Sequence, residues 1–311
     1  MRVLVTGGAG FIGSHVVDAL VARGDEVTVV DNLSSGSPRN LNPCARFEEL
    51  DIRSSEAADL VRALRPDGVC HLAAQVSVPA SLRDPLRDAD NNIMGSLALL
   101  TAASKVGSRF VFSSSGGAIY GERPDIPTPE TTTPRPTTPY GVGKLAVELY
   151  LHQFGVQHGT SYVALRYSNV YGPRQNAQGE AGVVAVFCLG AMGMREFRIH
   201  GSGADTRDYL YVDDVVRANL YALDSDRTGH YNIGSAKETD VNTLYRLVAD
   251  GFGSVIPARH GPPRVGDVHR SAVDIGLVAR ELGWRPTVSL HDGVRRTVEW
   301  FKSHREGAVR T

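Results

Sequence analysis

Residues 3–13, Val3-Leu4-Val5-Thr6-Gly7-Gly8-Ala9-Gly10-Phe11-Ile12-Gly13, decide the fold of this chain. The β-branched run at 3–6 predicts a buried strand, and the apolar spacing over Ile12–Arg23 predicts a helix directly after it. Glycines at positions 7, 10 and 13 allow a tight turn, a close approach of the backbone to a phosphate, and close helix–strand packing. The helix start also offers unpaired N–H groups. The stretch therefore predicts a pyrophosphate site between a strand and a helix.

The same alternation continues through the first half of the chain. Apolar runs predict further strands at Glu26–Val30, Val69–Leu72, Arg109–Ser113 and Tyr162–Arg166, and helical patterns predict helices at Ser55–Leu64, Asn91–Val106 and Tyr140–His158. Strands that alternate with helices and are apolar on both faces are typical of parallel sheets. The sequence predicts an α/β fold with a Rossmann-type doubly wound parallel sheet.

The alternation weakens after Asn169. We expect long loops at 172–182, 201–208 and 257–267, a buried helix at 182–194, and a final helix at 290–304. The expected organisation is a dinucleotide-binding domain at 1–169, to which segments at about 210–235 return. Residues 170–311 are expected to form mainly a smaller C-terminal α/β lobe that binds the substrate.

Composition excludes several classes of protein. The 33 basic and 34 acidic residues leave a net charge of −1 without blocks of one sign, which does not indicate a nucleic-acid or membrane partner. Cys44, Cys70 and Cys188 have no metal-like spacing and suit a reducing compartment better than a disulfide framework. The N-terminus does not resemble a signal peptide, and the apolar run at 182–194 is too short for a membrane span. A soluble cytoplasmic protein without a metal is expected.

Asp31 follows the second predicted strand, where a carboxylate can bind both hydroxyls of an adenosine ribose. A 2′-phosphate would be repelled there, and Asn32 supplies no positive charge to compensate. NAD is therefore favoured over NADP. The alternative is that Asp31 only caps the end of its strand.

Tyr140 and Lys144 lie one turn apart on one face of a predicted helix. A free tyrosine has a pKa near 10, and a neighbouring ammonium stabilises its phenolate and brings the pKa toward the working range. The pair therefore predicts a general base, although a tyrosine and a lysine at this spacing also occur on solvated helix faces.

Together these residues resemble the extended short-chain dehydrogenase/reductase family, and within it the nucleotide-sugar epimerases of the UDP-glucose 4-epimerase type. Five further segments carry the resemblance: Asp51-Ile52-Arg53, His71-Leu72-Ala73-Ala74, Ser113-Ser114-Ser115, residues 166–175, and Arg207-Asp208-Tyr209. The similarity spans nearly the whole chain.

The resemblance implies a set of cofactor contacts. Asp51 and Ile52 would hold the adenine, small apolar residues would line the cofactor after the third strand, and Asn91 would bond to it unless it caps its helix. Ser168 stands where many relatives have an aromatic residue. The implied NAD-binding residues are Gly7, Gly10, Phe11, Ile12, Gly13, Asp31, Asn32, Ser35, Gly36, Asp51, Ile52, Leu72, Ala73, Ala74, Asn91, Ser113, Tyr140, Lys144, Tyr167 and Ser168.

The resemblance also implies a nucleotide-sugar site. Asn169 would donate to the diphosphate, arginines would pair with its charges, and Asp267 would accept a hydrogen bond from a ribose hydroxyl. Val183 and His200 would flank the uracil, although uridine and thymidine are not distinguished. The implied substrate residues are Ser115, Tyr140, Asn169, Val183, His200, Arg207, Arg264, Asp267 and Ser271.

The implied reaction is epimerisation at C4 of the sugar. Ser115 would relay the proton of the 4-hydroxyl to Tyr140 while hydride passes to NAD, and the 4-keto sugar would turn before the hydride returns. Ser114 is the alternative relay. The other enzymatic candidates, a 4,6-dehydratase and a uronate decarboxylase, place acids after this serine, where the chain has Gly116 and Gly117. A non-catalytic NAD sensor or scaffold would not need the serine, tyrosine and lysine.

Two features of the resemblance stay open. Ser271 stands where some epimerases have a tyrosine that excludes N-acetyl sugars, so the substituents at C2 and C5 are undetermined. A homodimer is expected through the helices at Asn91–Val106 and Tyr140–His158, unless their apolar faces are both used against their own sheet.

Overall fold

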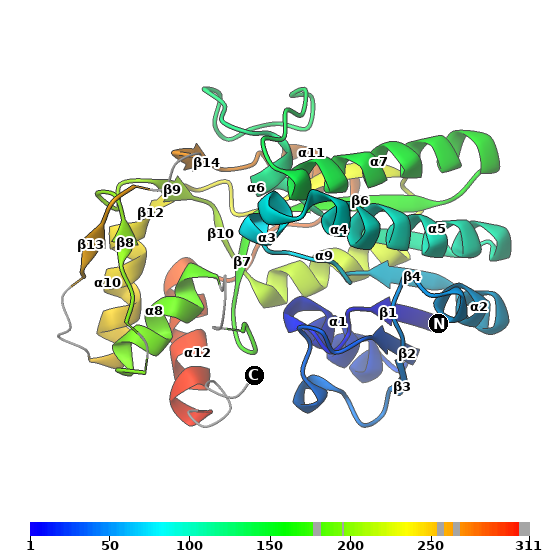
Figure 1. Ribbon diagram of the computed structural model, residues 1–311, viewed down its shortest axis with the longest axis horizontal. Coiled ribbons are helices and arrows are strands. Elements are labelled where there is room, and N and C mark those ends of the chain that lie inside the picture. The colour runs from blue at the N-terminus through cyan, green and yellow to red at the C-terminus, as the bar shows by residue number, and fades with distance from the viewer. Residues whose placement is uncertain (177–181, 195, 254–257, 264–267, 305–311) are drawn as a thin grey trace.

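The protein is described by a computed structural model over residues 1–176, 182–194, 196–253, 258–263 and 268–304. Figure 1 shows a large sheet with its helices beside a smaller group of helices and short strands. Among the described residues no helix combines the length and apolar character that a membrane crossing requires.

Seven parallel strands form the large sheet, in the order β3-β2-β1-β4-β5-β6-β11. The order reverses at β1, so the crevice beside its carboxyl end is the expected place for a ligand. This confirms the predicted Rossmann-type fold. The strands are β1 (Arg2–Thr6), β2 (Glu26–Asp31), β3 (Arg46–Glu49), β4 (Gly68–His71), β5 (Arg109–Ser115), β6 (Tyr162–Tyr167) and β11 (Gly229–Ile233).

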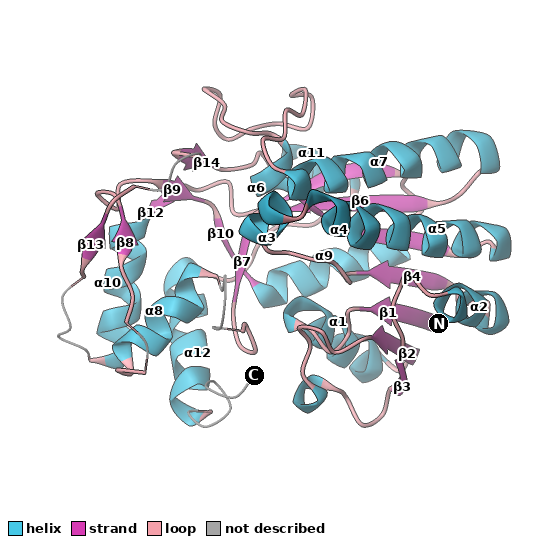
Figure 2. Ribbon diagram, in the orientation of Figure 1, coloured by secondary structure: helices cyan, strands magenta, loops and turns pink. Residues whose placement is uncertain are grey.

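Helices cover both faces of this sheet, as Figure 2 shows. One face packs on α1 and α9 through an apolar core built around Val16, Leu20 and Leu223. The other face packs on α2, α5 and α7 through Leu99, Phe110 and Leu151. These helices are α1 (Phe11–Arg23), α2 (Ser55–Leu64), α5 (Gly95–Val106), α7 (Pro139–His158) and α9 (Val212–Asp224), and α11 (Gly276–Glu281) packs near β11.

The second lobe has its own apolar core. Phe187, Tyr245 and Phe301 pack there with tyrosine side chains of β7 and β10. Its helices are α8 (Val183–Ala191), α10 (Val241–Phe252) and α12 (Leu290–Ser303). Its short strands pair as β7 (Asn169–Tyr171) with β10 (Tyr209–Tyr211), β8 (Ile199–His200) with β13 (His260–Gly261), and β9 (Thr206–Arg207) with both β12 (Thr239–Asp240) and β14 (Arg270–Ser271).

The predicted helix at Asn91–Val106 begins earlier than the sequence pattern indicates. The chain runs from α4 (Pro85–Ala89) through a π-helical turn, η2 (Asp90–Met94), directly into α5. Asn91 therefore lies inside a continuous helical segment, where its Nδ2 donates to Arg87 O at 2.9 Å, and it does not cap a helix start. Two further short helices, α3 (Val78–Arg83) and α6 (Gly116–Ile119), precede α4 and follow β5.

Strands β3 and β11 were not predicted from the sequence, and two expected loops contain the short strands β9 and β13. Strands of two to five residues carry too little periodicity to be recognised, and they form because a partner strand supplies their hydrogen bonds. Part of the expected loops at 172–182 and 257–267 lies outside the described residues.

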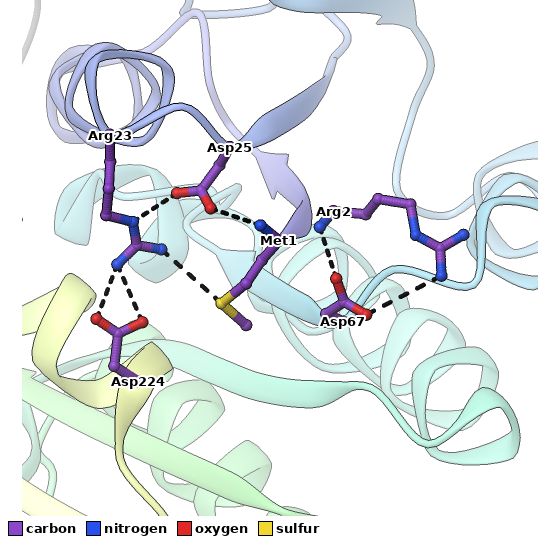
Figure 3. Close-up of polar contacts among 6 residues, drawn as sticks. All are labelled: Met1, Arg2, Arg23, Asp25, Asp67 and Asp224. Carbon is purple, nitrogen blue, oxygen red and sulfur yellow. Dashed lines mark hydrogen bonds and ion pairs between the residues drawn. The ribbon is translucent and has the colours of Figure 1, made fainter.

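A group of ion pairs lies at the amino ends of the strands of the large sheet, opposite the end where the site is predicted (Figure 3). The N-terminal ammonium of Met1 lies 2.8 Å from Asp25, and Arg23 binds both Asp25 at 2.6 Å and Asp224 at 2.8 Å. The group ties β1 and the end of α1 to α9. Burial acts against the charge of Asp25, but the hydrogen bonds from the N-terminus and Arg23 outweigh it and lower the pKa of this carboxyl.

Candidate functional site

The glycine turn between β1 and α1 forms a cradle that side chains would fill. Gly7 has φ of +73°, and a Cβ there would lie 2.7 Å from Ala73 N; a Cβ on Gly13 would lie 2.1 Å from Gly7 O. Gly10 caps α1 without a side-chain hydrogen bond, and the first turn carries no acidic residue. The N–H groups at Phe11, Ile12 and Gly13 therefore face a position suited to a phosphate.

Asp31 lies beside this cradle at the end of β2. Its carboxylate accepts hydrogen bonds from Ala9 N at 3.0 Å and Leu33 N at 2.8 Å, and only 7% of the residue is exposed. Burial raises its pKa, while the two backbone bonds act in the opposite direction. Gly36 lies close enough that a Cβ would come within 3.0 Å of Asp31 Oδ1. Asp31 thus caps its strand and fixes the glycine turn, and its contact with a ribose stays a prediction.

Asn32 and Asp51 are brought together next to Asp31. Asn32 Nδ2 donates to Asp51 Oδ2 at 3.0 Å, and Arg53 binds the same carboxylate through Nε at 2.9 Å and Nη2 at 2.8 Å. The Arg53 guanidinium holds the pKa of Asp51 well below its usual range. Ile52 is buried beside α5, and Ser35 is exposed in the loop after β2. The amino group of an adenine could therefore donate a hydrogen bond to the fixed carboxylate of Asp51.

Leu72, Ala73 and Ala74 follow β4 directly beside the glycine turn. Leu72 N donates to Thr6 O at 3.1 Å, and Ala73 N donates to Thr6 Oγ1 at 3.3 Å. Beneath them His71 bridges Thr6 Oγ1 at 2.6 Å and Ser96 Oγ at 2.8 Å. Burial lowers the pKa of His71 to about 3, so the ring is neutral. This histidine has a structural role and is not a base.

The predicted catalytic residues meet at the carboxyl end of β5. Tyr140 lies in the first turn of α7, whose N-cap Thr138 accepts from Gly141 N at 3.2 Å. Lys144 Nζ donates to Ser113 O at 2.7 Å and lies 5.8 Å from the centroid of the Tyr140 ring. Ser115, the last residue of β5, forms a hydrogen bond with Tyr140. Serine, tyrosine and lysine thus form one cluster.

In the protein without a bound cofactor, Tyr140 does not have the lowered pKa that its pairing with Lys144 predicts. Burial raises the pKa of Tyr140 to about 12, while the hydrogen bond with Ser115 acts in the opposite direction. Burial also lowers the pKa of Lys144 to about 8. Both changes follow because burial disfavours the charged form of each group. Further positive charge near the phenol is needed to make Tyr140 an effective base at neutral pH.

The geometry separates Ser114 from Ser115. Ser114 Oγ donates to Glu148 Oε1 at 2.5 Å, and Glu148 forms a buried ion pair with Arg166 at 2.6 Å. Arg166 Nη1 also donates to Tyr120 OH at 2.7 Å. Ser114 is therefore committed to a buried network, which leaves Ser115 as the hydroxyl that faces Tyr140. The sequence did not reveal this network, because its members are far apart along the chain and none of their spacings is distinctive.

Tyr167 and Ser168 differ in how well they fit the implied nicotinamide contact. The Tyr167 side chain lies in the core between the sheet and α9, on the face opposite α7, and its hydroxyl is 2.8 Å from Asn219 Nδ2. Its register partner on the neighbouring parallel strand β5 is Ser115. The Ser168 hydroxyl is buried and, among the described residues, has no hydrogen-bond partner. A carboxamide or sugar group could satisfy it.

The predicted substrate residues lie on several elements of the second lobe. Arg207 and Ser271 are register partners on β9 and β14, so the structure brings them side by side. Asn169 begins β7, and its Oδ1 would lie 3.8 Å from a Cβ on Gly117. Val183 begins α8, and the exposed His200 ends β8. Arg264 and Asp267 lie outside the described residues.

The two glycines after Ser115 differ in whether the surrounding structure requires a glycine. A Cβ on Gly116 would lie 2.9 Å from Val273 Cγ1 and 3.1 Å from Arg166 O, so packing excludes a side chain there. The nearest atom to a Cβ on Gly117 is Asn169 Oδ1 at 3.8 Å, which is ordinary contact. An acid could therefore fit at 117, and this chain has none. Among the described residues no group of His, Cys, Asp and Glu side chains is arranged to hold a metal ion.

Comparisons with known proteins identify relatives of the whole chain. The UDP-glucose 4-epimerase of Mycolicibacterium smegmatis is 41% identical over 310 residues, which are 97% of this chain and 99% of that protein. The structure of a Thermotoga maritima UDP-glucose 4-epimerase with UDP-glucose is similar at 50% identity with a TM-score of 0.96, and the match covers 98% of this chain and 100% of that chain. A Thermus thermophilus UDP-glucose 4-epimerase in complex with NAD is similar at 43% identity with a TM-score of 0.91, over 97% and 99% of the two chains.

A family model described as the NAD dependent epimerase/dehydratase family matches residues 3–234. The match contains the glycine turn, Asp31 and the Ser115–Tyr140–Lys144 cluster, and it confirms the resemblance found in the sequence. The chain therefore belongs to the NAD-dependent epimerase/dehydratase family.

Proposed function

We propose that this protein is an NAD-dependent nucleotide-sugar 4-epimerase that interconverts UDP-glucose and UDP-galactose. The observation that carries the proposal is the cluster of Ser115, Tyr140 and Lys144 at the end of β5, followed by glycines at 116 and 117. The cluster can remove and return a proton at one sugar hydroxyl. A dehydratase or a decarboxylase would need a further acid, which neither glycine supplies.

The described residues fit NAD at the switch point of the sheet. The glycine cradle at the start of α1 would hold its pyrophosphate and Asp31 its adenosine ribose. The buried Ser168 hydroxyl, which has no hydrogen-bond partner among the described residues, would face the nicotinamide. When bound, NAD supplies the hydride acceptor and donor for C4 of the sugar, and its positive ring favours the Tyr140 phenolate. Lys144 would bind the nicotinamide ribose while it stabilises the same phenolate.

Side chains of the protein transfer the proton of the sugar 4-hydroxyl. Ser115 donates its hydrogen to the Tyr140 oxygen while it accepts the hydrogen of the sugar 4-hydroxyl, so the O–H bond breaks as the C4 carbonyl forms. After the 4-keto sugar turns its other face to the cofactor, Tyr140 returns the proton through Ser115. Asn169 and Arg207 would hold the diphosphate during this rotation, since guanidinium and amide donors match phosphate oxygens. Arg264 and Asp267 are proposed to complete the nucleotide site.

The proposed organisation assigns residues 1–169, with a return at about 210–235, to NAD, and the remaining residues of 170–311 mainly to the nucleotide sugar. Support comes from β10, α9 and β11, which carry the chain from the second lobe back to the large sheet. The expected setting is galactose metabolism in the cytoplasm. The three free cysteines support a reducing compartment.

The test of the proposed function is an NMR measurement on the purified protein with UDP-galactose and no added NAD. We expect UDP-glucose to form, because NAD is regenerated in each cycle and is retained. A 4-keto-6-deoxy product would indicate a dehydratase, and loss of carbon dioxide from UDP-glucuronate would indicate a decarboxylase. A protein that contains NAD but never reduces it with a nucleotide sugar is a sensor or scaffold, and the proposal would then be wrong.

Substrate range is proposed to depend on Ser271, which lies beside Arg207 in the register of β14 and β9. A serine leaves space for an N-acetyl group at C2 or a carboxylate at C5. We expect Ser271→Tyr to lower turnover of UDP-N-acetylgalactosamine by about tenfold or more, since steric exclusion from a pocket costs about 1–3 kcal/mol. UDP-galactose turnover should change little. Ser271→Ala, which keeps the space, is the control, and equal losses with both sugars for Ser271→Tyr would contradict the idea.

A homodimer through α7 and α5 is part of the proposal. Val142, Leu149 and Val156 are spaced seven residues apart along α7 and are 49%, 63% and 65% exposed. A seven-residue spacing puts them on one side of the helix, away from the side that packs on the sheet. Nearby, Leu86 and Met94 are 82% and 59% exposed. Helix α7 therefore has an apolar face beyond the one used against its own sheet, and the exposed apolar residues of α4 and η2 lie beside it.

We expect Leu149→Glu to convert the dimer into a monomer, because a charge would be buried against the partner. Light scattering gives the mass directly. Tyr221→Glu, which adds the same charge to α9 at a residue that is 42% exposed, should leave the dimer intact. A wild-type protein that is monomeric at the concentrations of the assay would rule out this part of the proposal.

A further inference from the structure

Asp88, in α4, is a buried carboxylate that the proposed mechanism does not use. Only 2% of the residue is exposed. Its Oδ1 accepts from Gln75 Nε2 at 2.7 Å and Asn92 Nδ2 at 3.0 Å. The Asn92 amide is itself fixed by the backbone of Gln75. Its Oδ1 accepts from Gln75 N at 2.8 Å, and its Nδ2 donates to Gln75 O at 2.9 Å. Two fixed amides thus orient one oxygen of the carboxylate.

The other oxygen of Asp88 faces α7 next to the catalytic lysine. Asp88 Oδ2 would lie 3.6 Å from a Cβ on Gly143, the residue before Lys144, and Asn92 Cβ would lie equally close. Helices α4 and η2 both pack directly on α7. A side chain at 143 would intervene between the carboxylate and the helix that carries the catalytic pair.

Lys144 needs a counter-charge, because an ammonium is costly to bury. It is 4% exposed, and its Nζ donates to a neutral group, Ser113 O, and lies 4.8 Å from the Phe112 ring. Two carboxylates act on it: Asp88 from α4 and Glu148 from α7 itself. The charge of Glu148 is already balanced by Arg166, whereas Asp88 is hydrogen-bonded only to amides.

The other titratable groups that face this lysine add no negative charge at neutral pH. His71 of β4 is neutral, and Tyr140 carries its proton until it acts as a base. Burial lowers the pKa of Lys144 to about 8, and Asp88 is the larger of the two charges that oppose this change. The same carboxylate raises the pKa of Tyr140.

We propose that Asp88 is a positioning residue of the catalytic centre, the counter-ion that keeps the buried Lys144 protonated. Gln75 and Asn92 hold it for this role. The inference rests on the proposed function for its kinetic consequence, but the charge relation between Asp88 and Lys144 exists without substrate. With NAD bound, whose positive ring lowers the pKa of Tyr140, activity requires Lys144 protonated and Tyr140 deprotonated. It is then lost at high pH as Lys144 loses its proton and at low pH as Tyr140 gains one.

The test is the pH profile of kcat for Asp88→Asn, which keeps the shape of the side chain and removes its charge. Loss of a nearby negative charge lowers the pKa of both an ammonium and a phenol, so both limbs should move to lower pH by about one unit. Asp226→Asn, at a side chain that is 98% exposed, is the matched change in net charge and should leave the profile in place. A uniform loss of kcat with an unmoved profile would show a merely structural role and overturn the inference.

A measurement without substrate separates this inference from the proposed function. Trace labelling with acetic anhydride follows the neutral fraction of each amine, and peptide mass spectrometry resolves Lys144 from Lys105, Lys237 and Lys302. The labelling midpoint of Lys144 alone should fall in Asp88→Asn, even if the wild-type protein does not epimerise UDP-galactose. If this variant does not fold, Asp88→Ala with added formate replaces it, and formate should restore the midpoint. An unchanged midpoint, with either variant, contradicts the proposal.

Discussion

Tyr140→Phe is expected to lower kcat for UDP-galactose epimerisation by about 10³-fold, because general-base catalysis contributes about 10²–10⁴-fold. The phenylalanine ring keeps the packing over Lys144 but removes the oxygen that bonds to Ser115 and takes the proton. Bound NAD should remain at the wild-type level, since the glycine cradle and Asp31 are untouched. The measurement is conversion of UDP-galactose to UDP-glucose by NMR, with NAD content read from denatured protein.

Tyr150→Phe is the matched control for this prediction. Tyr150 lies on the same helix but is 42% exposed and far from β5 along α7. The kcat of the Tyr150→Phe variant should stay near the wild-type value. If Tyr140→Phe and Tyr150→Phe had similar kcat, Tyr140 would not be the base, and Ser115 alone would have to accept the proton.

Gly13→Ala is expected to deprive the protein of NAD. A Cβ at this position would lie 2.1 Å from Gly7 O and 3.0 Å from Gly8 Cα, and both are backbone atoms that cannot rotate away. Helix α1 must therefore move away from the turn, and the N–H groups at its start no longer lie where they would bind the pyrophosphate. Overpacking costs about 1–3 kcal/mol, and about 1.4 kcal/mol is a factor of ten in a binding constant. We expect a fall in NAD affinity of about 10- to 100-fold, measured by calorimetry on the protein freed of cofactor.

Gly261→Ala serves as the comparison for Gly13→Ala. A Cβ on Gly261 meets only the side chain of Arg198, at 3.6 Å or more, and the residue lies in the second lobe. Its NAD affinity should match the wild-type protein. An NAD affinity for Gly13→Ala equal to that of Gly261→Ala would show that the turn is not the phosphate site.

Local signals in the sequence were sufficient for most of the first lobe, although not for strands β3 and β11. The β1–turn–α1 unit, the helix at 55–64 and the Tyr140–Lys144 pair each depend on residues within one or two turns of one another, so spacing alone reveals them. The later return of the chain to the sheet through β11 was less visible, because a five-residue strand forms only where β6 supplies its partner.

The electrostatic environment of the site could not be predicted from spacing. Asp88 and Glu148 reach Lys144 from different helices, and Arg166 balances only one of them. Ser114 and Ser115 are adjacent in the sequence, yet the alternation of a strand turns one into the Glu148 network and the other toward Tyr140.

The sequence alone determined the Rossmann-type sheet, the place of the glycine turn and the pairing of Tyr140 with Lys144 on one face of a helix. These are properties of neighbouring residues, and short-range sterics and periodicity specify them. Only the tertiary structure decided which serine faces the tyrosine, that the Tyr167 hydroxyl accepts a hydrogen bond from Asn219 of α9, and that burial raises the pKa of Tyr140. The physical reason is that pKa values and side-chain partners depend on desolvation and on charges brought together from distant parts of the chain.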